Sequence, residues 1–427
     1  MGDLASSCIR QPVMSLQPAP TRRILTYENG LLLMLGFSWG FAFFDRQALS
    51  YLTPFFVPDL HINNAQVGML AAGLSLTWAI SAYVIGAWSD ATGVRKPFLL
   101  AAIIVFSLCS VLSGLAGSFV VLLAARVLMG SVEGPFLPIC LAIMSAESTP
   151  KRRGLNLGFM QNSFSSGLLI IAPLVLVWLA KTYGWRTAFF LSAAPGLILF
   201  LLVLRFVREP RRTALPSAAA APDAGPRLSL LQLLRVRNIW LCCLISCTMV
   251  GWLTQAANFL PLFLVQFRHF TAEQMAGIMS VVGLSTMSAG PIAAAISDRV
   301  GRKPVLIGFC LISLIAPLAA LYFSGPLWAL GALVYVGFLG SGTYPLFMGT
   351  IPAETISMRY AATSMGLIVC IGELVGGFVS PVLAGWAADL TTLQAPMFVS
   401  AGFAVVGVLL SLALEETAPV KTGVAVV

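Results

Sequence analysis

The sequence predicts an all-α polytopic membrane protein with twelve transmembrane helices in two pseudo-symmetric halves of six. Composition and an internal repeat predict this fold class. Of the 427 residues, 58% are apolar and only 10% are charged, and the mean hydropathy is +0.92. A soluble domain has about 25% charged residues, so this chain has too little polar surface to cover a water-soluble globule. The composition therefore excludes a mainly soluble enzyme with one membrane anchor.

Twelve apolar runs are each long enough to cross a bilayer, which takes about 20 residues. In chain order they cover residues 29–56, 65–88, 97–117, 119–146, 155–180, 187–206, 238–267, 273–296, 304–323, 327–352, 360–387 and 395–414. The domains expected from them are an N-terminal tail (1–28), a first six-helix half (29–206), a central loop (207–237), a second half (238–414) and a C-terminal tail (415–427). The central loop contains ALPSAAAAPDAGP, a composition typical of a flexible connection.

Positive charge gathers on one side of the predicted membrane. Twenty Lys and Arg residues fall on the side of the two termini and the central loop, and three fall on the other side. The positive-inside rule then places both termini in the cytoplasm. Because topology accounts for the net charge of +9, no nucleic-acid partner is indicated. We expect a monomer in the lipid bilayer of the inner, cytoplasmic membrane.

The loops after the second and eighth runs carry the same motif. GAWSDATGVRKP at 86–97 matches AAISDRVGRKP at 294–304, and further matches at the same offset, 207 or 208 residues, indicate two repeated six-helix halves. The residues expected to form a cytoplasmic gate are Asp90, Gly93 and Arg95 in the first copy and Asp298, Gly301 and Arg302 in the second. The glycine permits a tight turn, and the aspartate can cap a helix N-terminus or pair with an arginine.

Twelve spans in two halves with this loop motif resemble the major facilitator superfamily of secondary transporters, over nearly the whole chain. The resemblance implies two halves that rock about a central binding site, and no cofactor. The first motif copy departs from the family pattern, because Ala91, Thr92 and Val94 stand where a further basic residue is usual. The first copy of the cytoplasmic gate is therefore expected to be weaker than the second or to depend on Arg95.

Five charged residues remain inside the predicted spans, namely Asp45, Arg46, Arg126, Glu133 and Glu373. Each costs about 2.5–3.5 kcal/mol at a helix centre on insertion scales, so such residues usually have a function. With a helix rise of about 1.5 Å per residue, the distances of Asp45 and Glu133 from the ends of their predicted spans place both near the middle of the membrane. Arg126 and Glu133 are seven residues apart and share one helix face. Asp45 and Arg46 are adjacent and point about 100° apart.

The segments FFDRQALS, at 43–50, and RVLMGSVEGPFLP, at 126–138, are similar to the anion:cation symporter family within the superfamily. The resemblance implies that Arg46 binds the substrate carboxylate, that Asp45 and Glu133 are a protonatable pair, and that Arg126 sets the charge state of these acids in the substrate site. A guanidinium binds a carboxylate in bidentate fashion. The structural alternative is a set of buried salt bridges that only tie two helices together.

Other polar residues are candidates for the same site. Gln161, as a ligand of sugar hydroxyls, and Tyr51 and Asn258 are assigned to substrate binding, although interhelical hydrogen bonds are a common role for such amides. Glu373 is assigned to proton coupling, with a counter-charge for a cationic substrate group or a permanently neutral acid as alternatives. The cysteines and histidines lack metal-ligand spacing, so no metal site is expected.

The sequence therefore predicts a secondary transporter that takes up a small organic anion, such as a sugar acid, with H⁺, and leaves Na⁺ open as the coupling ion. It is not expected to be an enzyme, because it has no GxxxxGK[ST], HExxH or GxSxG motif. The alternative is a proton-linked exporter of amphipathic compounds or lysolipids, since GWRTAFFLSAAPG is also similar to the spinster group. A sensor is disfavoured because no sizeable soluble domain is present.

Overall fold

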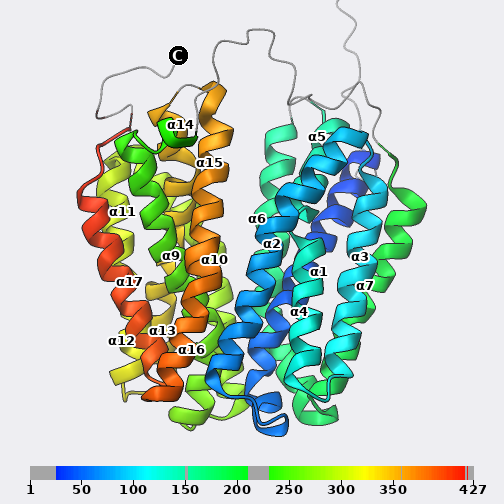
Figure 1. The fold of residues 1–427 in the computed structure, drawn as a ribbon, viewed down its shortest axis with the longest axis vertical. Coiled ribbons are helices and arrows are strands. Elements are labelled where there is room, and N and C mark those ends of the chain that lie inside the picture. Colours follow the sequence, from blue (N-terminus) through cyan, green and yellow to red (C-terminus); the bar gives the residue numbers. More distant parts are fainter. Residues whose placement is uncertain (1–25, 150–151, 210–229, 357, 419–420, 422–427) are drawn as a thin grey trace, which may run out of the picture.

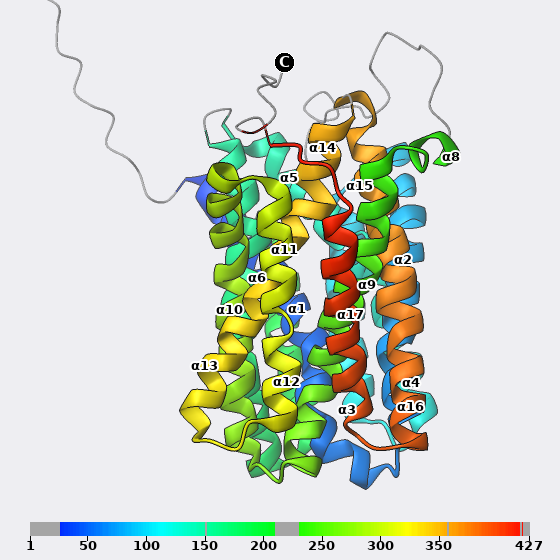
Figure 2. The ribbon, with the colours of Figure 1, turned by 90° about the vertical axis from the view of Figure 1, so that its left-hand side faces the viewer.

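Long apolar runs of the sequence form helices that lie side by side along one axis (Figures 1 and 2). The computed structural model describes residues 26–149, 152–209, 230–356, 358–418 and 421, but not the side chains of Asp90 and of residues 161–166, 230–231, 358–359 and 361–362. No strand occurs in these described ranges, and the predicted all-α class is confirmed. Most of the predicted flexible loop, residues 210–229, lies outside the described residues.

The first half contains seven helices. Their bounds are α1 (Tyr27–Asp59), α2 (Asn64–Thr92), α3 (Lys96–Gly114), α4 (Phe119–Glu133), α5 (Phe136–Glu147), α6 (Arg153–Tyr183) and α7 (Trp185–Phe206). The second half follows the short α8 (Leu230–Leu233) and is interrupted more often. Its segments are α9 (Arg237–Leu262), the π-helical η2 (Phe263–Phe267), α10 (Ala272–Val300), α11 (Arg302–Ile312), α12 (Ile315–Tyr322), α13 (Leu327–Phe338), the 3₁₀ η3 (Leu339–Thr343), the π-helical η4 (Leu346–Thr350), α14 (Ile351–Thr355), α15 (Met358–Gly372), the π-helical η5 (Glu373–Val379), α16 (Ser380–Leu390) and α17 (Ala395–Leu412).

These segments join into twelve long stretches, because α4 continues into α5 and each irregular segment of the second half continues a neighbouring helix. Each predicted apolar run lies within one stretch or overruns it by at most three residues. Ten described stretches are long and apolar enough to cross a membrane. The other two are α1 and α6, which have 33 and 31 residues and pack against each other. The polytopic membrane fold is thus confirmed.

Two ends of the bundle must be distinguished. We call the end at which α1 begins and α17 ends the termini end, and the opposite end the contact end. The ribbons of the two halves converge at the contact end and diverge toward the termini end (Figure 1). Both α2 and α10 begin at the contact end with a capping box, formed by Asn63 with Gln66 and by Thr271 with Gln274. Each box satisfies two N–H groups that a helix start would otherwise leave unpaired.

The halves touch most extensively through two helix pairs, α2 with α16 and α6 with α10, and also where α2 meets η5 and α1 meets α9. A Cβ atom on Gly68 would lie 2.1 Å from the carbonyl oxygen of Pro381, and one on Gly283 would lie 2.7 Å from the backbone of Leu169. Only glycine permits helix backbones to approach this closely without a shift. Each half therefore contributes a glycine that permits a close contact with the other half.

Candidate functional site

Helix α1 carries Asp45 near its midpoint, at a position that is buried. The Asp45 side chain is only 1% exposed, and the positive charge of Arg126 and the negative charge of Glu133 act on it. The hydroxyls of Ser110 and Ser192 lie beside the carboxylate, but neither oxygen of Asp45 has a hydrogen bond of good geometry among the described residues. An ionised carboxylate is costly in such a place, so this acid needs a proton or a closer cation whenever the site is closed.

Helix α4 presents Arg126 and Glu133 on one buried face, as their spacing predicts. Arg126 is fully buried and donates from Nη2 to Oγ of Ser113 on α3, over 3.0 Å. Its Nε and Nη1 atoms have no acceptor among the described residues, and Oε1 of Glu133 has no donor there. The pair is therefore close enough for mutual attraction but is not joined in a salt bridge, which leaves donors free for another anion.

Arg46 follows Asp45 in the chain but, unlike it, is partly exposed. Its guanidinium carbon lies 5.9 Å from the ring centroids of both Phe43 and Trp78, a range in which a cation is attracted to an aromatic face. The negative charges of Glu133, from the first half, and Glu373, from the second, both act on Arg46. Arg46 thus lies between the halves, with aromatic walls and two carboxylates around it.

A break in the fourth span positions Glu133 and Trp78. Helix α4 ends at Glu133, and a Cβ atom on the following Gly134 would lie 2.3 Å from both Oγ of Ser81 and the carbonyl oxygen of Trp78 on α2. Ser81 donates to the carbonyl oxygen of Gly130 over 3.0 Å. The glycines therefore bring α2 against α4, with Trp78 on α2 and Glu133 on α4 beside the same arginine.

The remaining predicted substrate ligands have different surroundings. Asn258 on α9 links the halves, because its Oδ1 accepts from Ser50 over 2.9 Å while its Nδ2 donates to the carbonyl oxygen of Thr254. Tyr51 is only 2% exposed and packs in the apolar core, so a substrate reaches it only after a rearrangement. The side chain of Gln161 lies outside the described residues.

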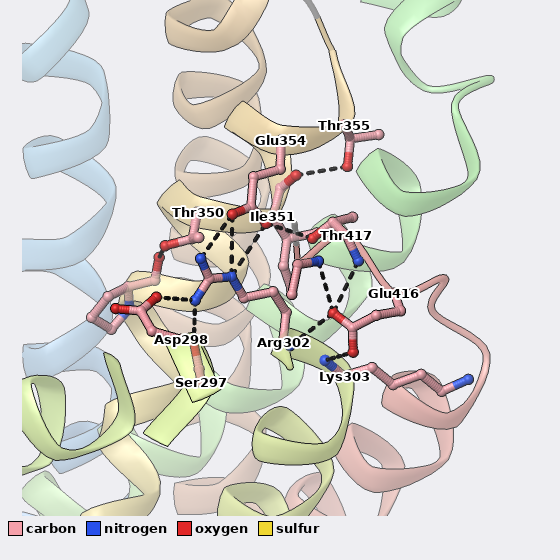
Figure 3. Close-up of polar contacts among 12 residues, drawn as sticks. Ser297, Asp298, Arg302, Lys303, Thr350, Ile351, Glu354, Thr355, Glu416 and Thr417 are labelled. Atoms are coloured by element: carbon pink, nitrogen blue, oxygen red, sulfur yellow. Dashed lines mark hydrogen bonds and ion pairs between the residues drawn. The ribbon is translucent and has the colours of Figure 1, made fainter. Parts of the chain in front are cut away.

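The second copy of the loop motif forms a polar network at the termini end (Figure 3). Arg302 donates from Nη2 to Glu354 over 2.8 Å and from Nη1 to Asp298 over 2.5 Å and to Ser297 over 2.6 Å. Gly301 has a φ of 115°, a conformation that other residues rarely adopt. The glycine therefore permits the turn that brings Arg302 back over the end of α10.

Sequence reasoning missed the acid that holds this network to the C-terminal tail. Glu416 accepts from the backbone N–H of Arg302 over 2.8 Å and of Lys303 over 3.2 Å, at the start of α11 (Figure 3). Burial alone would raise the pKa of Glu416, but backbone N–H groups of Ala418, Arg302, Lys303 and Thr417 together lower it below its usual value. The tail is thus anchored by an ionised cap on a helix N-terminus.

The first half repeats this cap. Glu209 accepts from the backbone N–H of Arg95 over 2.6 Å and of Lys96 over 2.8 Å, at the start of α3. Arg95 itself donates to Ser89 over 3.0 Å, and Gly93 has a φ of 66°. The side chain of Asp90 lies outside the described residues. A signal was present in the sequence, because Glu209 and Glu416 are 207 residues apart, as Arg95 and Arg302 are.

Polar contacts also close the contact end. Asp389, at the end of α16, accepts from the backbone N–H of Asn64 over 2.9 Å and of Ala65 over 2.8 Å. Lys181 of α6 forms an ion pair with Glu273 of α10. Within the described ranges, the side-chain hydrogen bonds that join the halves are these and the bond of Ser50 to Asn258. Asp389 and Lys181 thus bond the halves at the contact end, and Ser50 bonds α1 to α9 farther inside the bundle.

Comparison with known proteins identifies the family. The model of the Major Facilitator Superfamily matches residues 35–380. The chain belongs to this superfamily. It is a membrane transporter and not an enzyme. It is 30% identical over 349 residues to a probable 4-methylmuconolactone transporter of Cupriavidus pinatubonensis, with 79% of each chain covered.

Two other matches bear on substrate and fold. A hexuronate transporter of Bacillus subtilis is 26% identical, with 84% of this chain and 88% of the relative covered. The crystal structure of a bacterial homologue of the lysosomal transporter Spinster, inward-facing and unoccupied, superposes with a TM-score of 0.73 at 19% identity, over 91% of this chain and 97% of that one. The latter likeness shows the shared fold.

Proposed function

We propose that this superfamily member takes up a small organic anion together with protons, and that Arg46 holds the carboxylate of the substrate. The placement of Arg46 carries the proposal. It is partly exposed between the halves, and it forms no salt bridge with another described residue. A guanidinium with free donors is the best protein ligand of a carboxylate.

The neighbouring acids support proton coupling. Asp45 and Glu133 are 1% and 3% exposed, and both lie within the electrostatic reach of Arg126. Buried acids without complete hydrogen bonding are costly as ions. A proton taken up from one side of the membrane would neutralise them as the site closes, and its release on the other side would complete the cycle.

Aromatic walls and relatives indicate the substrate class. Phe43 and Trp78 flank Arg46 and can pack against a sugar ring or an aromatic ring. Two relatives are named as transporters of 4-methylmuconolactone and hexuronate. Sugar acids and ring-bearing carboxylates are therefore the first candidates.

The charge distribution supports an orientation with the termini end in the cytoplasm. Twenty of the Lys and Arg residues lie on that side of the predicted topology and three on the other. The contact end, where Asp389 caps α2 and Lys181 pairs with Glu273, then faces outward. In this orientation the structure corresponds to a state that is closed to the outside.

Uptake by proteoliposomes tests the function. We expect vesicles with purified protein to accumulate D-glucuronate, benzoate or 4-methylmuconolactone when an inward proton gradient is imposed, and to lose accumulation when the gradient is collapsed. Arg46→Ala should abolish binding and uptake, while Arg237→Ala, a change at an exposed arginine of the termini end, should leave both intact. No uptake across a broad carboxylate panel would contradict the proposal.

An exporter of amphipathic compounds is the second candidate, and one observation favours it. An apolar cavity of about 310 Å³ opens beside the break in the fourth span. Its lining is Ile85, Trp88, Pro97, Phe98, Ala101, Ala102, Val132 and Pro135. Such a cavity can take an acyl chain. Binding of lysolipids without binding of carboxylates would decide for this candidate.

A further inference from the structure

The acid that the second half contributes to the site sits in an unusual backbone. Glu373 begins the seven-residue π-helical segment η5, between α15 and α16. A Cβ atom on Gly377 would lie 2.5 Å from Oε2 of Glu373 and 3.3 Å from Ser75 of α2. The carboxylate is thus folded over η5, in the contact between the two halves. Short π-helical segments occur frequently at functional sites.

Among the described residues, one cation acts on Glu373. Elements α2, α9, α15 and α16 pack against η5. Among the described groups, Arg46 of α1 and Tyr344, between η3 and η4, are the ionisable side chains that interact electrostatically with Glu373. On α9, the Cys247 thiol donates to the carbonyl oxygen of Ile371. Oε2 of Glu373 is buried without a hydrogen-bond partner among the described residues.

We propose that Glu373 and the substrate carboxylate are alternative counter-ions of Arg46, so that Glu373 takes up a proton of its own when the substrate binds. This inference rests on the proposed function, in which Arg46 holds the carboxylate. In the empty site the negative charge of Glu373 offsets Arg46 from the opposite half. When the substrate anion arrives, two carboxylates face one guanidinium, and the displaced one binds a proton from water on the open side.

A count of formal charges gives the consequence for coupling. The site has three acids, Asp45, Glu133 and Glu373, and two arginines, Arg46 and Arg126. With a bound monocarboxylate the formal charge of the site is two negative charges. A closed site disfavours uncompensated charge. Two protons neutralise the loaded site. The empty site has a formal charge of one negative and, in this proposal, returns without a proton, so uptake of a monoanion moves one positive charge inward. Without the Glu373 carboxyl, one proton suffices and uptake becomes electroneutral.

Binding measured against pH tests the proposal in detergent, with D-glucuronate and benzoate as probes. Each proton linked to binding changes affinity by about tenfold per pH unit in the range where its group titrates. Between pH 6 and pH 8, we expect the affinity of the wild type to fall up to about 100-fold further than that of Glu373→Gln. Glu415→Gln, the same change at an exposed acid of the termini end, should follow the wild type.

The outcomes separate this inference from the proposed function. If the wild type binds its carboxylate and Glu373→Gln shows the same pH slope, Glu373 is not a counter-ion and the inference is wrong while the function stands. If Glu373→Gln lowers affinity equally at every pH, its role is only structural, which also overturns the inference. If the wild type binds neither these probes nor any carboxylate of the panel, the proposed function itself fails.

Electrogenicity gives a second readout in proteoliposomes without a pH gradient. We expect a membrane potential of 100 mV, inside negative, to drive up to about 50-fold accumulation of a monocarboxylate by the wild type. Glu373→Gln should exchange the same substrate across the membrane but show no response to the potential. An undiminished response in this variant would overturn the inference, even if its affinity had changed.

Discussion

The contact between Asp389 and the start of α2 predicts how a single side chain biases the two halves. The side chain of Asn63 already accepts a hydrogen bond from the backbone N–H of Gln66 in the first turn of α2. Asp389 takes the N–H groups of Asn64 and Ala65 and also accepts from the Asn64 amide over 2.9 Å. It therefore satisfies donors that α2 cannot satisfy alone, and these bonds exist only while α2 and α16 are together.

The expected magnitude follows from this geometry. Asp389→Asn removes a negative charge near a helix N-terminus, which is worth about 0.3–1 kcal/mol at an exposed position, and it also removes one of the two accepting oxygens, so the expected cost is at the upper end, about 1 kcal/mol. Since 1.36 kcal/mol corresponds to a factor of ten, Asp389→Asn should raise the population with separated α2 and α16 about fivefold. Asp59→Asn is the matched control, because Asp59 binds Arg186 and Trp185 within the first half.

Pulsed electron paramagnetic resonance can measure this population. Spin labels at the exposed positions Ser118 and Thr392, in a background without accessible native cysteines, would report the separation of the halves at the contact end. We expect Asp389→Asn to increase the long-distance fraction and Asp59→Asn to leave it unchanged. A shift of less than twofold in Asp389→Asn, or an equal shift in the control, would refute the reasoning.

Two further predictions concern stability and pH. Gly134→Ala should lower the melting temperature, because its Cβ would meet α2 at 2.3 Å and overpacking costs about 1–3 kcal/mol, whereas Gly167→Ala, which has open space, should not. The Thr417 and Ala418 amides should be protected from hydrogen exchange above the usual pKa of a glutamate, and their protection factors, which allow for the slower intrinsic exchange in acid, should fall as pH falls through the lowered pKa of Glu416. Glu416→Gln should show fast exchange throughout, and protection in that variant would contradict an ionic cap.

The helices and the charged residues of the interior could be predicted from sequence because both follow from the cost of transfer into lipid. Apolar runs predicted the ends of the stretches to within four residues, and the seven-residue spacing of Arg126 and Glu133 predicted one buried face. The direction of Glu373 could not be predicted, because η5 is π-helical and a period of 3.6 residues does not apply there.

Contacts between distant segments were the other limit of sequence reasoning. Asp389 and Asn64 are 325 residues apart, and nothing local to Asp389 marks it as a cap of α2. Glu209 and Glu416 lay in segments without an obvious motif, although their common spacing of 207 residues repeated that of the loop arginines. Such caps become visible only when the ends of several helices are placed in space.

The central claim is that a proton and a carboxylate share the site around Asp45, Arg46 and Glu133. Paired assays of Glu133→Gln in the same proteoliposomes test it most directly, with proton-driven accumulation measured beside exchange of substrate across the membrane. The account predicts that exchange is retained while proton-driven accumulation falls far below that of the wild type, because the variant still binds substrate but has lost one of its proton sites. Accumulation equal to that of the wild type would contradict the account.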